Sequence, residues 1–152
     1  MVRMTKSDIP RSLSLIRIIL GHGGVADVLL KNGANTNIVD DSNTTALHLA
    51  ARNGHGGVAD VLLKNGANAD IIDALKNTPL HYAARNGHEN VAELLINKGA
   101  SMDVMGNFNH TPLHLAARNG HKNVAELLIK KGAKVDVRNL ANLTPRQLAV
   151  SH

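Results

Sequence analysis

The hexapeptide AARNGH occurs three times in this sequence, beginning at Ala50, Ala83 and Ala116, so that successive copies lie 33 residues apart. Other residues keep the same period over four units, among them Thr45, Thr78, Thr111 and Thr144. A fixed period of this length is typical of stacked structural units, each of which buries its apolar face only against its neighbours. The sequence therefore predicts a solenoid rather than a closed globule.

Each unit carries the start and end signals of two helices. Thr78 is followed by proline and begins the first helix, because threonine caps a free backbone N–H and proline at the first helical position has no N–H to lose. Gly87 should end this helix of about nine residues by adopting a positive φ. A second helix then turns Val91 and Leu95 inward and ends at Gly99 as a left-handed cap. The alanines of AARNGH allow neighbouring helix pairs to approach closely.

This unit resembles the ankyrin repeat. The family's succession of a TPLH helix, a GH turn, an LL helix and a GA terminus is found in TPLHYAARNGHENVAELLINKGA and in TPLHLAARNGHKNVAELLIKKGA. The resemblance covers nearly the whole chain, from about Gly21 to Ala149. It implies an all-α fold, an ankyrin-repeat solenoid of stacked helix pairs with β-hairpin-like fingers along one edge. It also implies a protein-binding module without catalysis.

The repeats predict a single domain over residues 1–152 and its internal boundaries. We expect a frayed segment (1–11), an N-terminal capping repeat (12–39), three full repeats (40–72, 73–105 and 106–138) and a C-terminal half-repeat (139–152). The short apolar run near the N-terminus is interrupted by Arg17, which favours a helix over Ser12–Leu20 rather than a signal peptide. No second helix follows to cover Val124–Ile129, so this edge is exposed or the chain is a piece of a longer array.

The finger tips depart from the family's pattern. The resemblance implies a glycine near each tip, where this sequence has Asn43, Lys76, Asn109 and Asn142. Asparagine tolerates the left-handed conformation well, whereas lysine in that conformation costs about 1–2 kcal/mol. We therefore expect the finger that contains Lys76 to be remodelled.

Nine histidines raise the question of a metal site. Six of them fall in two periodic series, His48, His81 and His114 and then His55, His88 and His121. Equivalent histidines of adjacent units are separated by the spacing of packed helices, about 8–10 Å, whereas two nitrogens on one zinc ion lie no more than about 4 Å apart. A bridge between the two series within one unit stays open, although no carboxylate has helpful spacing. We expect these rings to bond backbone groups and to bind no metal.

The sequence contains no catalytic motif. The glycine clusters at 21–24 and 54–57 lack the Lys-Ser/Thr pair and the preceding strand of a phosphate-binding loop. Neither HExxH, GxSxG nor a paired-carboxylate arrangement occurs. We therefore expect a chain that is not an enzyme and uses no cofactor.

Arg52, Arg85 and Arg118 form a third periodic series, each followed by asparagine. The resemblance places them on the concave face, one for each unit. They could hold an acidic partner or a phosphate backbone, or they represent only a common residue choice at this position. The net charge of +5 permits electrostatic binding of nucleic acid, but Tyr82 and Phe108 are the only aromatic residues and no Lys/Arg tract occurs. Nucleic acid is therefore the less favoured ligand.

Residues on the fingers and the inner helix surface vary between units, whereas the scaffold positions do not. Variation confined to one surface is expected of a recognition face, and exposed apolar residues often mark such faces. We predict that the chain binds another protein through its concave face and finger tips. The predicted contacts are Asp41, Ser42, Thr44, Arg52, Ile72, Leu75, Asn77, Arg85, Met105, Asn107, Phe108, His110, Arg118, Arg138, Leu140 and Leu143. A structural or synthetic scaffold without a natural ligand is a third interpretation, because the units are nearly identical.

The composition also bears on location. The sequence has no cysteine, which favours a reducing compartment, and no apolar run approaches the roughly 18–20 residues that span a bilayer. We expect a cytoplasmic or otherwise intracellular monomer with no membrane association. A secreted effector that acts inside a host cell also fits these observations.

Overall fold

The computed structural model of the chain describes residues 23–150. In that part the helices are α2 (Gly23–Lys31), α3 (Ala46–Asn53), α4 (Gly56–Lys64), α5 (Pro79–Asn86), α6 (Glu89–Asn97), α7 (Pro112–Arg118), α8 (Lys122–Lys130) and α9 (Pro145–Val150), with a 3-10 turn η1 (Asn107–Asn109) before α7. The described residues contain no strand, so their architecture is all-α. The expected frayed segment 1–11 and the expected helix over Ser12–Leu20 lie outside the described residues.

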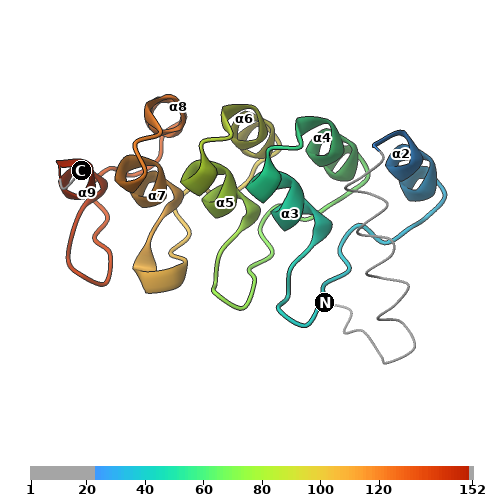
Figure 1. The fold of residues 1–152 in the computed structure, drawn as a ribbon, viewed down its shortest axis with the longest axis horizontal. Helices are drawn as coiled ribbons and strands as arrows, with labels where there is room; N and C mark the ends of the chain where they lie inside the picture. The colour runs from blue at the N-terminus through green and yellow to red at the C-terminus, as the bar shows by residue number, and fades with distance from the viewer. Residues whose placement is uncertain (1–22, 151–152) are drawn as a thin grey trace.

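The helices lie in two rows (Figure 1). α3, α5, α7 and α9 pack against one another in chain order and form the first row, while α2, α4, α6 and α8 form the second. α3, α5 and α7 each also pack against the helix that follows in sequence. Equivalent residues of consecutive units are therefore neighbours in space. The predicted solenoid of stacked helix pairs is confirmed.

One continuous apolar core runs along the stack between the two rows. Its members recur with the period of the sequence, as in Leu62, Leu95 and Leu128 of the second row. The alanine pair of AARNGH, seen at Ala83 and Ala84, is fully buried in this core. Because alanine leaves room for close helix packing, this part of the hexapeptide is fixed by the interior of the stack.

A threonine caps the start of each helix from α3 to α7 in the first row. At α5, Nδ1 of His81 accepts a hydrogen bond from the Thr78 N–H at 3.0 Å and lies 2.8 Å from the threonine hydroxyl. The same arrangement occurs at Thr45 and Thr111. The predicted caps are therefore present, and the histidine of each TPLH or TALH motif completes them.

The capping histidines also join consecutive units. Nε2 of each ring donates to a backbone carbonyl of the next unit over 2.9–3.0 Å, in the pairs His48 with Asn77, His81 with His110 and His114 with Leu143. An amide N–H only donates and a carbonyl only accepts, so each ring is neutral and carries its proton on Nε2. The expectation that these histidines bond backbone groups is confirmed, and both ring nitrogens are engaged.

The second histidine series closes the turns between helices. His121 Nε2 donates to the Arg85 carbonyl over 2.9 Å, and His88 Nε2 donates to the Arg52 carbonyl over 3.1 Å. The ring of His121 lies against Gly87, where a Cβ atom would be 2.5 Å from Nδ1. Gly87 also has a φ of 75°, which L side chains rarely adopt. Packing and backbone conformation therefore both require the GH of AARNGH.

Four loops of the described part project from one side of the stack (Figure 1). We call residues 40–44, 73–77, 106–110 and 139–143 the first to fourth fingers. Each is closed by a hydrogen bond from the N–H of its first residue to the carbonyl of its last, over 2.8–3.1 Å. Because the described residues form no strand, the hairpin-like fingers implied by the resemblance are turns without a β-ladder.

The expected remodelling of the second finger is wrong. Lys76 has a φ of 65°, close to the 57° of Asn43 at the equivalent tip. Asp73 explains this, because its Oδ1 accepts from the N–H of Leu75 at 3.0 Å and from the N–H of Asn77 at 2.9 Å. These two bonds hold the loop in the shared conformation although lysine is disfavoured there.

The edge formed by α8 is partly open. α9 packs against α7 at the C-terminal end of the first row. In the second row α8 packs against α6, and no described helix covers the opposite side of α8. Here α7, α8 and α9 border an apolar hollow of about 510 Å³. Ile129 is 52% exposed, whereas the equivalent Leu30 and Ile96 are buried and half-buried. The apolar side of Val124–Ile129 is therefore exposed in part, as expected from the sequence.

Candidate functional site

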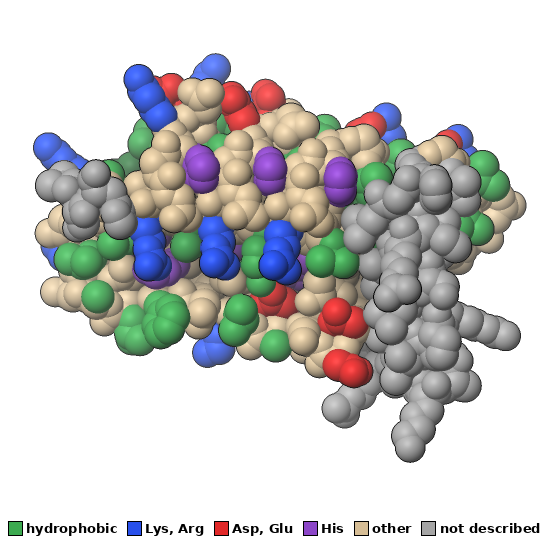
Figure 2. Space-filling model, viewed as in Figure 1, with side chains coloured by type: hydrophobic (Ala, Val, Ile, Leu, Met, Phe, Trp, Pro, Cys, Tyr) green, Lys and Arg blue, Asp and Glu red, His purple; other side chains and the backbone are tan. Residues whose placement is uncertain are grey.

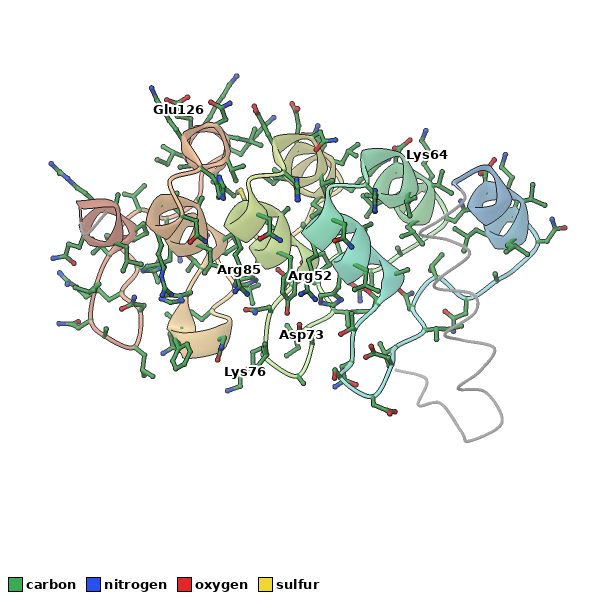
Figure 3. The ribbon with its side chains drawn as sticks, viewed as in Figure 1. Arg52, Lys64, Asp73, Lys76, Arg85 and Glu126 are labelled. Atoms are coloured by element: carbon green, nitrogen blue, oxygen red, sulfur yellow. The ribbon has the colours of Figure 1, made fainter. Side chains whose placement is uncertain are left out.

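Three arginines form a row along the inner face of the stack, the side of α3, α5 and α7 that turns toward the fingers. Figure 2 shows three basic side chains side by side, and Figure 3 labels Arg52 and Arg85. Arg52, Arg85 and Arg118 lie in the last turns of α3, α5 and α7, where a cation offsets the partial negative charge of the helix end. All three are exposed. The third periodic series is therefore a surface row of guanidinium groups.

The arginines of this row differ in their surroundings. The Tyr82 hydroxyl donates to Asp73, and burial and the Asp73 carboxylate raise its pKa while the charge of Arg52 opposes them. Arg52 thus shares its neighbourhood with a carboxylate. The ion pairs among the described residues join only second-row helix side chains. Arg85 and Arg118 therefore have no acidic partner in the described part of the chain.

The third finger differs from the other three in its first residue. The others begin with aspartate or asparagine, whose side-chain oxygen accepts hydrogen bonds from N–H groups of the same loop. The third begins with Gly106, which has no such oxygen. This loop turns differently, because Phe108 and Asn109 both adopt left-handed conformations with φ of 55° and 56°. Phe108 lies at the tip of the finger and is 62% exposed.

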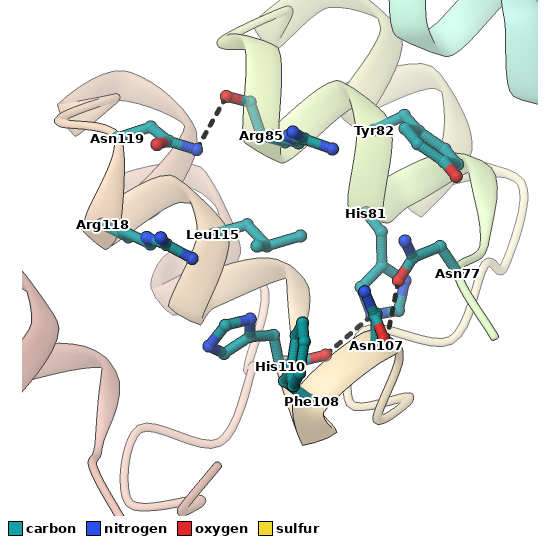
Figure 4. A pocket seen from close by; sticks show the side chains of 10 residues that line it. All are labelled: Asn77, His81, Tyr82, Arg85, Asn107, Phe108, His110, Leu115, Arg118 and Asn119. Carbon is teal, nitrogen blue, oxygen red and sulfur yellow. Dashed lines mark hydrogen bonds between the residues drawn. The ribbon is translucent and has the colours of Figure 1, made fainter. Parts of the chain in front are cut away.

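Asn77 ties the third finger to the second. Its Oδ1 accepts from the Asn107 N–H at 3.1 Å (Figure 4), and a Cβ on Gly106 would overlap the same oxygen. The first and second fingers, and the third and fourth, are instead joined by backbone bonds of 2.9 Å. Asn77 is only 7% exposed. This predicted contact residue therefore positions the finger and offers little surface to a partner.

A hollow of about 250 Å³ opens between α5, α7 and the third finger (Figure 4). Predicted contact residues make up much of its wall: Asn77, Arg85, Asn107, Phe108, His110 and Arg118. The structure brings these six together from elements that are separate in the sequence. Pockets for whole small molecules measure about 300–1,000 Å³, so this hollow suits one or two side chains of a partner better than a cofactor.

The two histidines in the wall of the hollow resist protonation. Burial lowers the pKa of His81 to about 4. Burial, followed by the nearby His114 and Arg118, lowers the pKa of His110. The described residues of the wall include no aspartate or glutamate. With neutral histidines, the formal charge of the hollow comes from Arg85 and Arg118.

Sequence reasoning missed several residues of the wall, notably Tyr82, Leu115 and Asn119. Tyr82 and Leu115 occupy the position after the capping histidine, which changes from leucine to tyrosine to leucine within otherwise repeated motifs. That variation is the sequence signal by which this position of the wall could have been identified. Asn119 Nδ2 donates to the Arg85 carbonyl over 3.1 Å and joins α7 to α5. Asn86 Nδ2 makes the equivalent bond to the Arg52 carbonyl over 2.9 Å, so packing explains the asparagine at these two positions.

The remaining predicted contacts lie outside the hollow. Thr44 and Leu143 are half-buried, and Arg138 donates to the Asn142 carbonyl of the fourth finger at 2.9 Å. Exposed side chains on or beside the fingers are Asp41, Ser42, Ile72, Leu75, Met105, Arg138 and Leu140. Figure 2 shows apolar side chains along the fingers below the arginine row. The fingers thus extend the surface of the hollow with exposed apolar groups.

No three His, Cys, Asp or Glu side chains of residues 23–150 are grouped closely enough to hold a metal ion. None of the described helices is both long and apolar enough to cross a membrane.

Comparison with known protein families adds to this geometry. The family model for ankyrin repeats (3 copies) matches residues 14–106, 58–139 and 99–152. These matches include every residue of the hollow and of the four fingers. No curated protein matches the chain. The resemblance seen in the sequence is confirmed over nearly its whole length.

Proposed function

The chain belongs to the ankyrin-repeat family, whose repeats are generally protein–protein interaction modules, and on that premise we propose that it binds a protein partner at the hollow between α5 and α7. The exposed side chains of the third finger complete the contact surface. The hollow has room for one or two side chains of the partner, and the proposed binding involves neither catalysis nor a cofactor.

The observation that carries this proposal is the exposure of Phe108. Its ring has one aromatic neighbour, the ring of His110 at a centroid distance of 6.4 Å, and otherwise faces outward from the third finger. Leaving such a side chain in water forgoes about 1.5–3 kcal/mol of burial free energy. Aromatic residues and arginines also dominate the binding energy of many interfaces. Phe108 beside Arg85 and Arg118 supplies both.

The double variant Phe108→Ala/Arg118→Ala tests the proposal. Neither side chain makes a hydrogen bond within the described residues, so helicity and thermal stability should stay unchanged in circular dichroism. Immobilised wild-type chain should retain a protein from a lysate of the source cell, and the double variant should lose it. A matched control, Glu126→Ala/Lys130→Ala, alters only the exposed side of α8 and should retain it. Equal retention by all three chains would remove this face from consideration.

A second candidate is electrostatic binding of nucleic acid, which the row of three exposed arginines favours. A titration with duplex DNA at low salt distinguishes this candidate from protein binding. A row of guanidinium groups that binds phosphates must bind the DNA under those conditions. No binding at low salt would end this reading. If neither protein nor nucleic acid is retained, the interpretation as a scaffold without a natural ligand gains support.

We further propose that the chain acts as a monomer inside a cell, either in the cytoplasm where it is made or in a host cell. The absence of cysteine from the sequence supports a reducing compartment. Sedimentation at micromolar concentration should give the mass of one chain, and a dimer mass would contradict the proposed state.

A further inference from the structure

The hollow between α5 and α7 carries two positive charges that the described chain does not neutralise. Arg85 and Arg118 form no ion pair within residues 23–150. The carboxylate of Asp73 is already engaged, since one oxygen accepts two backbone N–H groups and the other accepts the Tyr82 hydroxyl. It is also buried. The described chain therefore supplies no anion to the two arginines of the hollow, and a ligand could supply one.

The lack of anions is local to this part of the inner face. Figure 2 shows acidic side chains below the arginine row toward its α3 end, where Arg52 lies, and none visible below the rest of the row. Asp41 of the first finger is exposed near that end. The charges of Arg85 and Arg118 are thus less opposed than the charge of Arg52, which leaves a positive site between α5 and α7.

The hollow also has an apolar part. Leu115 lies between the two arginines and Phe108 stands at the rim (Figure 4). A guanidinium group matches a carboxylate through paired N–H donors, whereas Leu115 and Phe108 gain free energy only by covering apolar surface. A ligand that satisfies the whole hollow must offer both kinds of group close together.

We propose that the partner presents an acidic side chain to Arg85 and Arg118 and, beside it in the same segment, an apolar side chain to Phe108 and Leu115. The inference rests on the proposed function, that is, on a protein ligand at this face, and adds the chemistry of that ligand. A phosphate backbone would satisfy the arginines but would leave Leu115 and Phe108 without an apolar partner. An acidic peptide segment satisfies all four residues.

The test is a selection of random peptides displayed on phage against the full chain. A counter-selection on Phe108→Ala/Arg118→Ala removes peptides that bind elsewhere. The surviving peptides should be enriched in aspartate or glutamate next to an aliphatic or aromatic residue. Their affinity should fall about tenfold or more in Arg85→Gln/Arg118→Gln and should weaken as salt is raised.

A charge-matched control separates local recognition from net charge. Lys130→Gln/Lys131→Gln removes two exposed positive charges at the end of α8, away from the hollow, and should change affinity less than about twofold. Two outcomes would overturn the inference and leave the proposed function standing. One is a set of surviving peptides that is not enriched in acidic residues, and the other is an equal loss of peptide affinity in the arginine and the lysine double variants. If no peptide survives the counter-selection, the proposed function itself fails at this face. Displacement of the peptides by duplex DNA of equal or higher affinity would overturn the inference in favour of nucleic acid.

Discussion

The second and third fingers are neighbours with equivalent positions in the repeat, yet they are stabilised in different ways. In the second, the carboxylate of Asp73 accepts two N–H groups of its own loop and the hydroxyl of Tyr82. In the third, Gly106 offers no side-chain acceptor, and the side chain of Asn77 in the second finger supplies one. The side-chain acceptor for the N–H groups of the second finger therefore lies within that finger, while the third finger takes one from its neighbour.

This difference shows how a repeat array can vary its surface without altering its core. The helices that follow the two fingers, α5 and α7, begin with the same threonine–histidine cap, and both bury the first alanine of their alanine pair. A change from aspartate to glycine at the first residue of one finger is accompanied by a second left-handed residue, Phe108, at its tip. The exposed aromatic group of the candidate site is a consequence of that local rearrangement.

Lowering the pH should have the largest effect on the free energy of unfolding, and it should act on both fingers. The last carbonyl of each finger accepts a hydrogen bond from a buried neutral histidine, His48 for the second finger and His81 for the third. Burial lowers the pKa of His81 from 6.5 to about 4. The unfolded chain takes up a proton below about pH 6.5 and the folded chain only near pH 4, so stability is complete above this window and falls as the pH is lowered through it. The expected loss from His81 is about 3 kcal/mol.

Burial also lowers the pKa of His48 and of His114, so these rings act in the same direction. Urea unfolding at about pH 7 and about pH 5 measures the first part of the loss before most carboxylates titrate. In His81→Gln, which keeps a polar side chain without a titrating ring, the difference between the two pH values should shrink. An unfolding free energy that stays constant between these pH values would contradict the neutral, buried state of these rings.

Gly106→Ala should have the next largest effect, because its Cβ would overlap Asn77 Oδ1 and approach the ring of His81. We expect a loss of about 2 kcal/mol in urea unfolding, typical of overpacking in a filled site. In an Asn77→Ala background the same substitution should cost about 1 kcal/mol less, since the overlapping oxygen is gone. Additive losses would show that the third finger does not depend on Asn77.

Asp73→Ala should cost about 1–2 kcal/mol, because two backbone N–H groups and the Tyr82 hydroxyl lose their acceptor in a buried place. The matched control is Asp41→Ala, which removes an exposed carboxylate of the first finger that accepts no hydrogen bond within the described residues. Its cost should be smaller. A larger loss in the control would contradict the view that Asp73 organises the second finger.

Lys76→Gly should give the smallest effect and the opposite sign. Removing a left-handed lysine relieves about 1–2 kcal/mol of strain, and the extra freedom of glycine in the unfolded chain offsets about 0.4–1 kcal/mol of that gain. The variant should therefore be more stable by about 0.5–1 kcal/mol. Asn43→Gly, at the equivalent tip of the first finger, should gain less because asparagine tolerates this conformation.

The sequence predicts the stack well because its determinants are local and repeated. A threonine cap, a glycine with a positive φ and a pair of alanines each impose one conformation or one packing distance, as Thr78, Gly87 and Ala83 illustrate. The fingers are less predictable because their conformation depends on acceptors that side chains supply across the loop. Asp73 holds the second finger in the shared conformation in spite of Lys76. The finger that turns differently is the third, whose first residue, Gly106, has no side-chain acceptor.

The candidate site was predictable only in part for a related reason. The period identifies Arg85 and Arg118, and variation at the tip identifies Phe108, but only the fold brings them around one hollow. Asn77 is variable in the sequence although its main role is to hold the next finger. A period alone does not separate a packing residue from a contact residue. His81 and Arg85 recur with the same spacing, and only the structure shows that His81 is buried and hydrogen-bonded while Arg85 is exposed.

Amide hydrogen exchange tests the central claim, recognition at the third finger and the adjoining hollow, most directly. The chain is compared free and bound to a partner captured from the source cell. Exchange should slow on binding over residues 105–119, which span Phe108, Leu115 and Arg118. Protection confined to the apolar edge of α8 and α9, with exchange at 105–119 unchanged, would contradict the claim.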